Sequence, residues 1–460
     1  MKTTCLKILL RASILLISTQ LLAQNNAIET DLTAEITAHQ AASIAQPFSL
    51  QQASKKVKIR HVQMSPNGQH LHYMTNEANG VALHLLDMKT ETTRTLFHSS
   101  ILKRANWSVD GNILFLQSAS YLAYINPFEP DAKPQIFYHF DRQNEEHFYG
   151  INNSQPQQVL IRRTINTKND SKPHQLVSMN KEGEETILYA DKIEIFDFVF
   201  DESGQLAFIR QPDKQKHNIF LLTNSGKEHI FSCSVIDKCR MIKFDKSTKE
   251  LFILGVDQYS FRSLFSLNII TKAVNLVHQD PEQIADLLSV HVDDATGEVI
   301  QLQYQSDRIR HYGLNEQWNN HYRLLESQLP GNLYISTRIN GNHWLIKQTN
   351  AQLHHHKYFK YNLNSKKLTP ILESHRLAGE PIAANQLAAN LPISYLASDG
   401  MLLHGYVMLP SGRELSEVPL ITSVHGGPFN RVKGGFSPVQ YLVNQGFAIF
   451  QPNFRSSTGY

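Results

Sequence analysis

Several kinds of residue are scarce in this chain. Cysteine occurs three times among 460 residues, so the sequence is not that of a disulfide-rich scaffold. Charged residues make up 18% and the formal net charge is only +3, with no dense stripe of lysine and arginine. We therefore expect no nucleic-acid partner. The remaining composition is that of a soluble globular protein, and the length favours two domains of unequal size.

Long apolar runs are also scarce, and the clearest one stands at the N-terminus. Positive charges up to Arg11 precede the apolar residues 12–22, which end at the small Ala23 before a polar segment. This pattern predicts a signal peptide over residues 1–23 and export to the periplasm or the extracellular space. The run is too short to span a bilayer, so no stable membrane anchor is expected; an anchored helix is the alternative. Cys5 lies among the charges, which argues against a lipoprotein.

Removal of residues 1–23 would leave two cysteines, Cys233 and Cys239. In an oxidising compartment they could form a disulfide that closes a small loop. Two unpaired thiols are the other interpretation, and the sequence leaves both open.

The three consecutive histidines at 354–356 are the one run that suggests a metal. They stand in a predicted strand over residues 353–361, where alternate side chains point to opposite faces, so three adjacent ligands would diverge. A solvated strand is expected there. We predict no metal and no cofactor.

The middle of the chain repeats one pattern from about residue 61 to residue 372: an apolar strand, a tight turn with Asp, Asn or Ser before Gly, and further apolar strands. The clearest unit begins at Val62, and related units begin at Ala105, Phe198, Ile242 and Val290, with weaker copies near Tyr149 and Asn342. A period of roughly 45 to 50 residues is typical of a four-stranded β-propeller blade. We predict an all-β propeller over 56–375, with seven blades favoured; six or eight blades and a pair of stacked sandwiches are the alternatives.

The propeller is flanked by two further regions. Residues 24–55 contain apolar residues at helical spacing and are predicted as an N-terminal helical segment. Residues 376–390 are poor in strand formers and are predicted as a hinge. A hairpin around the turn Ser398-Asp-Gly400 then opens a second domain, predicted over 391–460.

Two motifs stand in this last segment. Residues 418–428 read VPLITSVHGGP, and residues 445–460 read QGFAIFQPNFRSSTGY. Together with the upstream propeller and the Ser-Asp-Gly hairpin, they resemble the prolyl oligopeptidase family of serine peptidases, in its acylaminoacyl-peptidase-like and dipeptidyl-peptidase-like branches. The resemblance implies an N-terminal portion: a propeller followed by the truncated start of an α/β-hydrolase domain.

Roles for individual residues follow from this resemblance. Gly426 or Gly427 would contribute a backbone N–H to an oxyanion hole, and His425 would shape the loop. A tight turn without a catalytic duty is the alternative for the glycine pair. Arg455 is expected to make a structural ion pair or to bind loop carbonyls. Ser456 stands where family members usually carry Gly, which would be strained if its φ is positive.

The catalytic groups themselves cannot be assigned. No Gly-x-Ser-x-Gly, the motif that presents the nucleophile, occurs in the sequence. We expect the Ser-Asp-His triad to lie beyond Tyr460 and this chain alone to be inactive. The predicted function is a secreted serine peptidase that cleaves short peptides, present as a fragment. A catalytically dead propeller that binds a peptide or a protein, and an esterase, are the alternatives.

Two further features carry weaker expectations. Glu145 and Glu146 resemble the acidic pair with which dipeptidyl peptidases hold a substrate amine, but two adjacent acids are more typical of a solvated face. In the truncated domain, residues 420–424 would lack a partner strand on one side. Such an open apolar edge predicts self-association.

Overall fold

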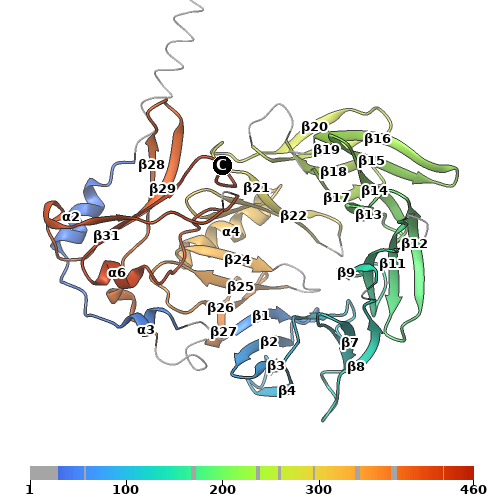
Figure 1. The fold of residues 1–460 in the computed structure, drawn as a ribbon, viewed down its shortest axis with the longest axis horizontal. Coiled ribbons are helices and arrows are strands. Elements are labelled where there is room, and N and C mark those ends of the chain that lie inside the picture. Colours follow the sequence, from blue (N-terminus) through green and yellow to red (C-terminus); the bar gives the residue numbers. More distant parts are fainter. Residues whose placement is uncertain are drawn as a thin grey trace, which may run out of the picture. The chain divides into compact units, whose positions relative to one another are not determined.

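The structure is a computed structural model that describes residues 30–55, 59–141, 143–166, 172–234, 239–256, 261–293, 296–336, 342–373, 381–427 and 429–460 (Figure 1). The predicted signal peptide lies outside these residues, as does part of the predicted hinge. The chain forms two compact units. One comprises Met1–Lys55, Thr349–His354 and Pro381–Thr458, and the other comprises Lys56–Gln348, His355–Glu380 and Gly459–Tyr460.

The larger unit is built from small antiparallel sheets. The first three contain β1 (Ile59–Met64), β2 (His70–Glu77), β3 (Gly80–Asp87) and β4 (Thr93–Ser99); β5 (Arg104–Trp107), β6 (Leu114–Gln117), β7 (Tyr121–Ile125) and β8 (Gln135–His139); β9 (Glu145–Ile151), β10 (Gln158–Thr164), β11 (His174–Asn180) and β12 (Glu185–Asp191). The next two contain β13 (Asp197–Phe200), β14 (Leu206–Asp213), β15 (Lys216–Thr223) and β16 (Gly226–Ser234); β17 (Arg240–Asp245), β18 (Glu250–Gly255), β19 (Ser263–Asn268) and β20 (Val274–His278).

Two more sheets and a helix complete this unit. They are β21 (Leu287–Val292), β22 (Val299–Gln305) and β23 (Ile309–Tyr312); the helix α4 (Glu316–Gln328); and β24 (Asn332–Ser336), β25 (His343–Thr349), β26 (Lys357–Asn362) and β27 (Leu368–Glu373). The described residues of this unit thus form seven sheets, which follow one another in chain order (Figure 1). The prediction of a mostly β chain made of small repeated sheets is confirmed.

Neighbouring sheets pack through their apolar faces. One buried cluster joins Leu83 of the first sheet to Leu114 of the second, and another joins Phe208 to Leu251. A further cluster contains Leu71 of the first sheet together with residues of β25, β26 and β27 in the last sheet. The first and last sheets of the unit therefore pack against each other although they are far apart in the sequence.

The turns follow the predicted chemistry. After the first strand of several sheets a glycine takes a positive φ, with φ 68° at Gly68, 71° at Gly111 and 78° at Gly204. A glycine has no Cβ and reaches this region without steric cost. In the fifth sheet, where the repeat carries no glycine, Lys249 adopts φ 60° at the corresponding turn. One predicted repeat is displaced: the unit placed near Asn342 matches β25, because β24 precedes it as the first strand of that sheet.

The smaller unit carries one mixed sheet with short helices. Its elements are α2 (Thr33–Ala41), α3 (Leu50–Ala53), η1 (Ala384–Gln386), β28 (Leu391–Leu396), β29 (Leu402–Met408), η2 (Leu415–Glu417), β30 (Leu420–Thr422), α6 (Gln440–Asn444) and β31 (Ala448–Asn453). The strand order is β28-β29-β31-β30, and β30 runs parallel to β31.

The core of the smaller unit lies between this sheet and α6. Met408, Val443 and Ile449 form one buried cluster. The N-terminal segment contributes to a second cluster through Phe48 and Ala53. The predicted helix in this segment is present as α2, but none of its residues is buried. Within the part of the chain that the structure describes, no helix combines the length and apolar character needed to cross a bilayer.

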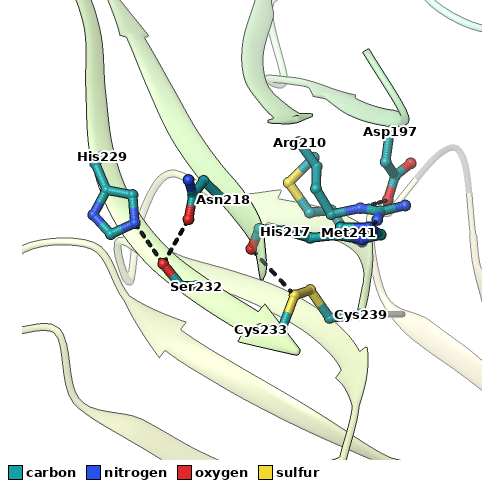
Figure 2. The surroundings of a disulfide bond; sticks show 9 residues. All are labelled: Asp197, Arg210, His217, Asn218, His229, Ser232, Cys233, Cys239 and Met241. Carbon is teal, nitrogen blue, oxygen red and sulfur yellow. Dashed lines mark hydrogen bonds and ion pairs between the residues drawn. A yellow bond between two sulfur atoms is a disulfide. The ribbon is translucent and has the colours of Figure 1, made fainter. Parts of the chain in front are cut away.

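A disulfide joins two adjacent sheets of the larger unit. Cys233 lies near the end of β16 and Cys239 directly before β17, and their sulfur atoms are bonded (Figure 2). Cys239 is buried, with 1% of its surface exposed. Of the two interpretations that the sequence left open, a disulfide or two unpaired thiols, the structure contains the disulfide.

Candidate active-site loop

The loop after β30 carries the predicted site residues. The N–H of Ser423 donates to the carbonyl of Phe450 over 2.8 Å, which extends the pairing of β30 with β31. Both strands run in the same direction, so the segments after them leave the sheet at the same edge. The structure therefore brings residues 423–427 and 454–458 together, as the 2.8 Å distance between Nε2 of His425 and Oγ of Ser457 also indicates.

Both ring nitrogens of His425 are engaged. Nδ1 lies 2.9 Å from the carbonyl oxygen of Gly426, and Nε2 lies 2.8 Å from Oγ of Ser457. A carbonyl oxygen only accepts, so these partners assign the proton to Nδ1, and Nε2 accepts from the Ser457 hydroxyl. The ring also stacks on Phe454. This arrangement fits the role of shaping the loop, because neither nitrogen is left for a substrate.

The two glycines are not equivalent. Gly427 has φ 155°, and a Cβ at this position would lie 3.0 Å from the backbone nitrogen of Phe429. A Cβ at Gly426 would meet nothing within 4 Å. Gly427 therefore needs to be glycine for the loop to form, whereas Gly426 borders open space through which a reacting carbonyl can approach. Their part in an oxyanion hole stays a prediction.

Arg455 lies in an ion pair. Its guanidinium donates to the carboxylate of Asp399 over 2.5 Å. This hydrogen bond and a second one from the Met401 N–H lower the pKa of Asp399 to about 2. Both side chains are about half exposed, so the pair contributes little to stability. It fixes the segment after β31 against the turn between β28 and β29.

Ser456 has φ 69°. A non-glycine residue in this left-handed region is strained, because its Cβ crowds the neighbouring carbonyl oxygen. The sequence predicted strain at Ser456 if its φ is positive, and the φ is positive. The backbone at Ser456 thus has a conformation that glycine adopts more easily than serine.

An apolar edge lies beside the loop. β30 is the outermost strand of its sheet, and among the described strands it pairs with β31 alone. Leu420, Val424 and Phe429 have 62%, 66% and 80% of their surfaces exposed. Unpaired backbone groups together with exposed apolar side chains form a surface that favours pairing with another strand.

Other residues considered in the sequence have structural partners. Glu146 accepts hydrogen bonds from the Tyr138 hydroxyl at 2.8 Å and from the Asp141 N–H at 2.7 Å. Its carboxylate is held by β8 of the neighbouring sheet and by the segment between β8 and β9, and Glu145 beside it is exposed. Glu146 also lines a cavity of about 440 Å³.

The prediction for the histidine run was wrong in its local structure. β26 begins at Lys357, after the histidines, and both His354 and His355 are buried instead of solvated. His354 accepts from the N–H of Ile382 at 3.1 Å and packs on the ring of Phe436. The pattern misled because the apolar packing comes from residues distant in the sequence. Across the described residues no group of three or more metal-ligating side chains gathers.

A buried charge network escaped the sequence reasoning. The carboxylate of Asp197 accepts from the N–H of Met241 at 2.7 Å and lies 3.8 Å from Nε of Arg210, whose guanidinium contacts His217 (Figure 2). Burial raises the pKa of Asp197, and Arg210 opposes this. The network lies beside the disulfide and joins the same two sheets. The only signal in the sequence was an Asp and an Arg inside apolar strands, where an isolated charge is costly.

The chain is similar in sequence to two dipeptidyl peptidases. It is 28% identical to dipeptidyl aminopeptidase BIII of Pseudoxanthomonas mexicana, over 43% of this chain and 29% of that protein. It is 24% identical to dipeptidyl peptidase family member 6 of Caenorhabditis elegans, over 64% of this chain and 44% of that protein. The chain thus spans less than half the length of these relatives. No family model matches it.

Solved structures of peptidases share its fold. A puromycin-hydrolyzing peptidase of Mycobacterium tuberculosis matches with a TM-score of 0.64 and 12% identity, over 91% of this chain and 70% of that structure. Dipeptidyl peptidase 4 of Porphyromonas gingivalis matches with a TM-score of 0.57 and 11% identity, over 91% of this chain and 75% of that structure. At these identities the likeness establishes the fold alone.

Proposed function

We propose that this chain belongs to the prolyl oligopeptidase family of serine peptidases, as its similarity to two dipeptidyl peptidases and its fold support. We further propose that it is part of an exported enzyme that cleaves short peptides. The observation that carries the proposal is the loop Ser423–Gly427, in which a glycine with open space around it follows a parallel strand. In this geometry a backbone N–H can stabilise the negative charge that develops on a carbonyl oxygen.

We assign the seven sheets of the larger unit to seven blades of a closed propeller. Each sheet is a run of consecutive antiparallel strands, as a blade requires. Closure is supported by the buried cluster that joins the first sheet to the last. The propeller would restrict access to the site, so that only short peptides are admitted.

We assign the smaller unit to the beginning of an α/β-hydrolase domain. An antiparallel hairpin, β28 and β29, is followed by the parallel strands β30 and β31, and the histidine-glycine loop stands directly after β30. In that fold a loop of this kind supplies part of the oxyanion hole, and the nucleophilic serine stands on a later strand-to-helix turn.

The triad is not assigned to any residue of this chain. We propose that the serine, the aspartate and the histidine follow Tyr460, and that the 460 residues alone do not hydrolyse peptides. The serine would attack the scissile carbonyl, the histidine would transfer its proton, and the aspartate would orient the histidine. The completed strand arrangement would also cover the exposed edge at β30.

The experiment compares this chain with a version extended through the downstream reading frame. A fluorophosphonate probe, which labels activated serines, should label the extended protein and leave the 460-residue chain unlabelled. Chromogenic dipeptidyl amides, N-blocked peptides and simple esters then separate exopeptidase, oligopeptidase and esterase activity. A serine-to-alanine variant of the labelled residue serves as the control. Labelling or hydrolysis by neither protein would overturn the proposal.

A binding module is the second candidate. Its support is the set of seven sheets in the larger unit, which can form a binding surface by themselves. A reading frame without a downstream triad, together with capture of unlabelled peptides by the chain, would support it over the peptidase.

A further inference from the structure

A groove of about 740 Å³ lies between the first and the last sheet of the larger unit. One wall comes from β2, β3 and β4, and the other comes from β25, β26 and β27. Its volume is within the range of small-molecule binding sites. The groove is separate from the candidate active-site loop, and the argument for it does not depend on the proposed peptidase activity.

The inner part of the groove offers an apolar and aromatic surface. The ring of Tyr73 stacks on that of His84, with centroids 4.8 Å apart and planes at 25°. His84 is held in place because both its nitrogens contact threonine hydroxyls, those of Thr75 at 2.8 Å and Thr95 at 3.0 Å. Leu86 and Ile371 complete this surface from the two facing sheets. It suits a flat aromatic ring or a short aliphatic chain.

A lysine lines this groove without a carboxylate partner among the described side chains. Lys360 on β26 lines the groove, and its ammonium donates to the carbonyl of Gly68 at 3.1 Å. An ammonium has three donors, so this bond leaves two of them for other acceptors. Burial lowers the pKa of Lys360, which indicates that water solvates the charge incompletely.

Two acidic side chains, Asp87 and Glu91, also line the groove. Asp87 accepts from the backbone N–H groups of Lys89 at 2.8 Å and Thr90 at 3.0 Å, within its own turn. Lys367 adds a second positive charge to the lining. The groove therefore presents a cationic group beside an apolar surface, and the matching ligand carries a negative charge beside an apolar body.

We propose that this groove binds an organic carboxylate with an aromatic or aliphatic body. The carboxylate pairs with the ammonium of Lys360, and the body lies on Tyr73, Leu86 and Ile371. A charge-assisted hydrogen bond in a partly desolvated site is stronger than one at the surface. The same chemistry is offered by the C-terminus of a short peptide and by a free organic acid.

The proposal is tested by calorimetric titration of the 460-residue chain with four probes. N-acetyl-phenylalanine and octanoate should bind, and N-acetyl-phenylalanine amide, which has the same body without the charge, should bind at least tenfold more weakly. N-acetyl-alanyl-phenylalanine tests the peptide source: tighter binding than octanoate assigns the groove to peptide ends, and weaker binding assigns it to free acids. Equal binding of the acid and the amide would overturn the proposal.

Variants locate the site. Lys360→Met should weaken N-acetyl-phenylalanine at least tenfold, and Lys360→Arg should restore most of the affinity. The matched control is Lys357→Met, because Lys357 is an exposed lysine on the same strand that does not line the groove. It should bind as the parent does.

Lys360 also bonds the turn at Gly68, so its replacement could weaken binding through a folding defect. A second variant, which keeps Lys360, controls for this. Thr369 is exposed and lies directly opposite Lys360 on β27. Thr369→Glu would place a carboxylate beside the ammonium, and cross-strand neighbours of opposite charge pair. Binding should fall at least tenfold with the melting temperature retained, whereas Thr369→Gln should bind normally. Unchanged binding in both Lys360→Met and Thr369→Glu would refute the site.

Discussion

The imidazole of His425 lies flat on the ring of Phe454, with centroids 4.3 Å apart and planes at 15°. The two residues follow neighbouring parallel strands, so this contact ties the loop after β30 to the segment after β31. Ser457 continues the tie through its hydroxyl, which donates to Nε2 of His425. The position of the glycine pair therefore depends on a segment about 30 residues further along the chain.

The first prediction concerns this tie. Ser457→Ala removes the donor to His425. We expect the free energy of local opening of the loop at 423–427 to fall by about 1 kcal/mol. Amide hydrogen exchange of the loop, followed by mass spectrometry, measures the change. Thr458→Ala is the control, because among the described residues the hydrogen bond of Thr458 comes from its backbone N–H and not from its side chain. Equal protection in the two variants would contradict the assigned role of Ser457.

The second prediction separates the two glycines. In an extended, active protein, Gly427→Ala should lower kcat by a factor on the order of 10², because the new Cβ collides with the backbone of Phe429 and moves the oxyanion donors. Gly426→Ala should stay near the parent, since its Cβ enters open space. Steady-state kinetics with a chromogenic peptide provide both constants. Similar losses in the two variants would show that the loop does not have this conformation.

The third prediction concerns Ser456. Its φ of 69° carries the cost of the left-handed region, and Ser456→Gly should stabilise the smaller unit by about 0.5–1 kcal/mol. Urea unfolding monitored by fluorescence measures the change. Ser456→Ala keeps a Cβ and should give no gain, which makes it the control. A destabilised glycine variant would mean that the serine side chain has a partner that offsets the strain.

The fourth prediction concerns the edge at β30. We expect the 460-residue chain to self-associate through this strand, and Val424→Lys to shift it toward monomer, because a lysine disfavours edge-to-edge pairing. Sedimentation velocity at several concentrations measures the distribution. Ile270→Lys replaces a similarly exposed apolar residue, with 69% of its surface exposed, in the larger unit. If both variants dissociate alike, general hydrophobicity explains the association better than the edge.

The repeat could be read from the sequence because its determinants are local. Alternating apolar residues recur in each sheet, and in several sheets a glycine takes the positive φ that the turn requires. The start near Asn342 was displaced because it was placed at the Asn-Gly pair of residues 340–341, which stands between β24 and β25 in the sequence. The loop at His425 was found by its motif. For Arg455 the sequence predicted an ion pair but not its partner, Asp399.

The contacts that were missed join residues far apart in the sequence. Lys360 and Gly68 are separated by 292 positions, and Asp197 and Met241 by 44. A local pattern carries no information on which strand will face which. The burial of His354 and His355 was missed for the same reason, since the elements that cover them come from elsewhere in the chain.

The last prediction is a pH dependence of stability. His72 on β2 is wholly buried, and burial lowers its pKa from 6.5 to about 3. Below pH 6.5 the histidine of the unfolded chain binds a proton, whereas the buried histidine of the folded chain stays neutral. The contribution of neutral His72 to stability is therefore complete above pH 6.5. It is lost as the pH falls toward about 3, at up to ~1.4 kcal/mol per pH unit. His72→Leu should flatten the acid limb of unfolding free energy measured in urea between neutral pH and about pH 4. A variant that runs parallel to the parent over this range would show that His72 is not the group responsible.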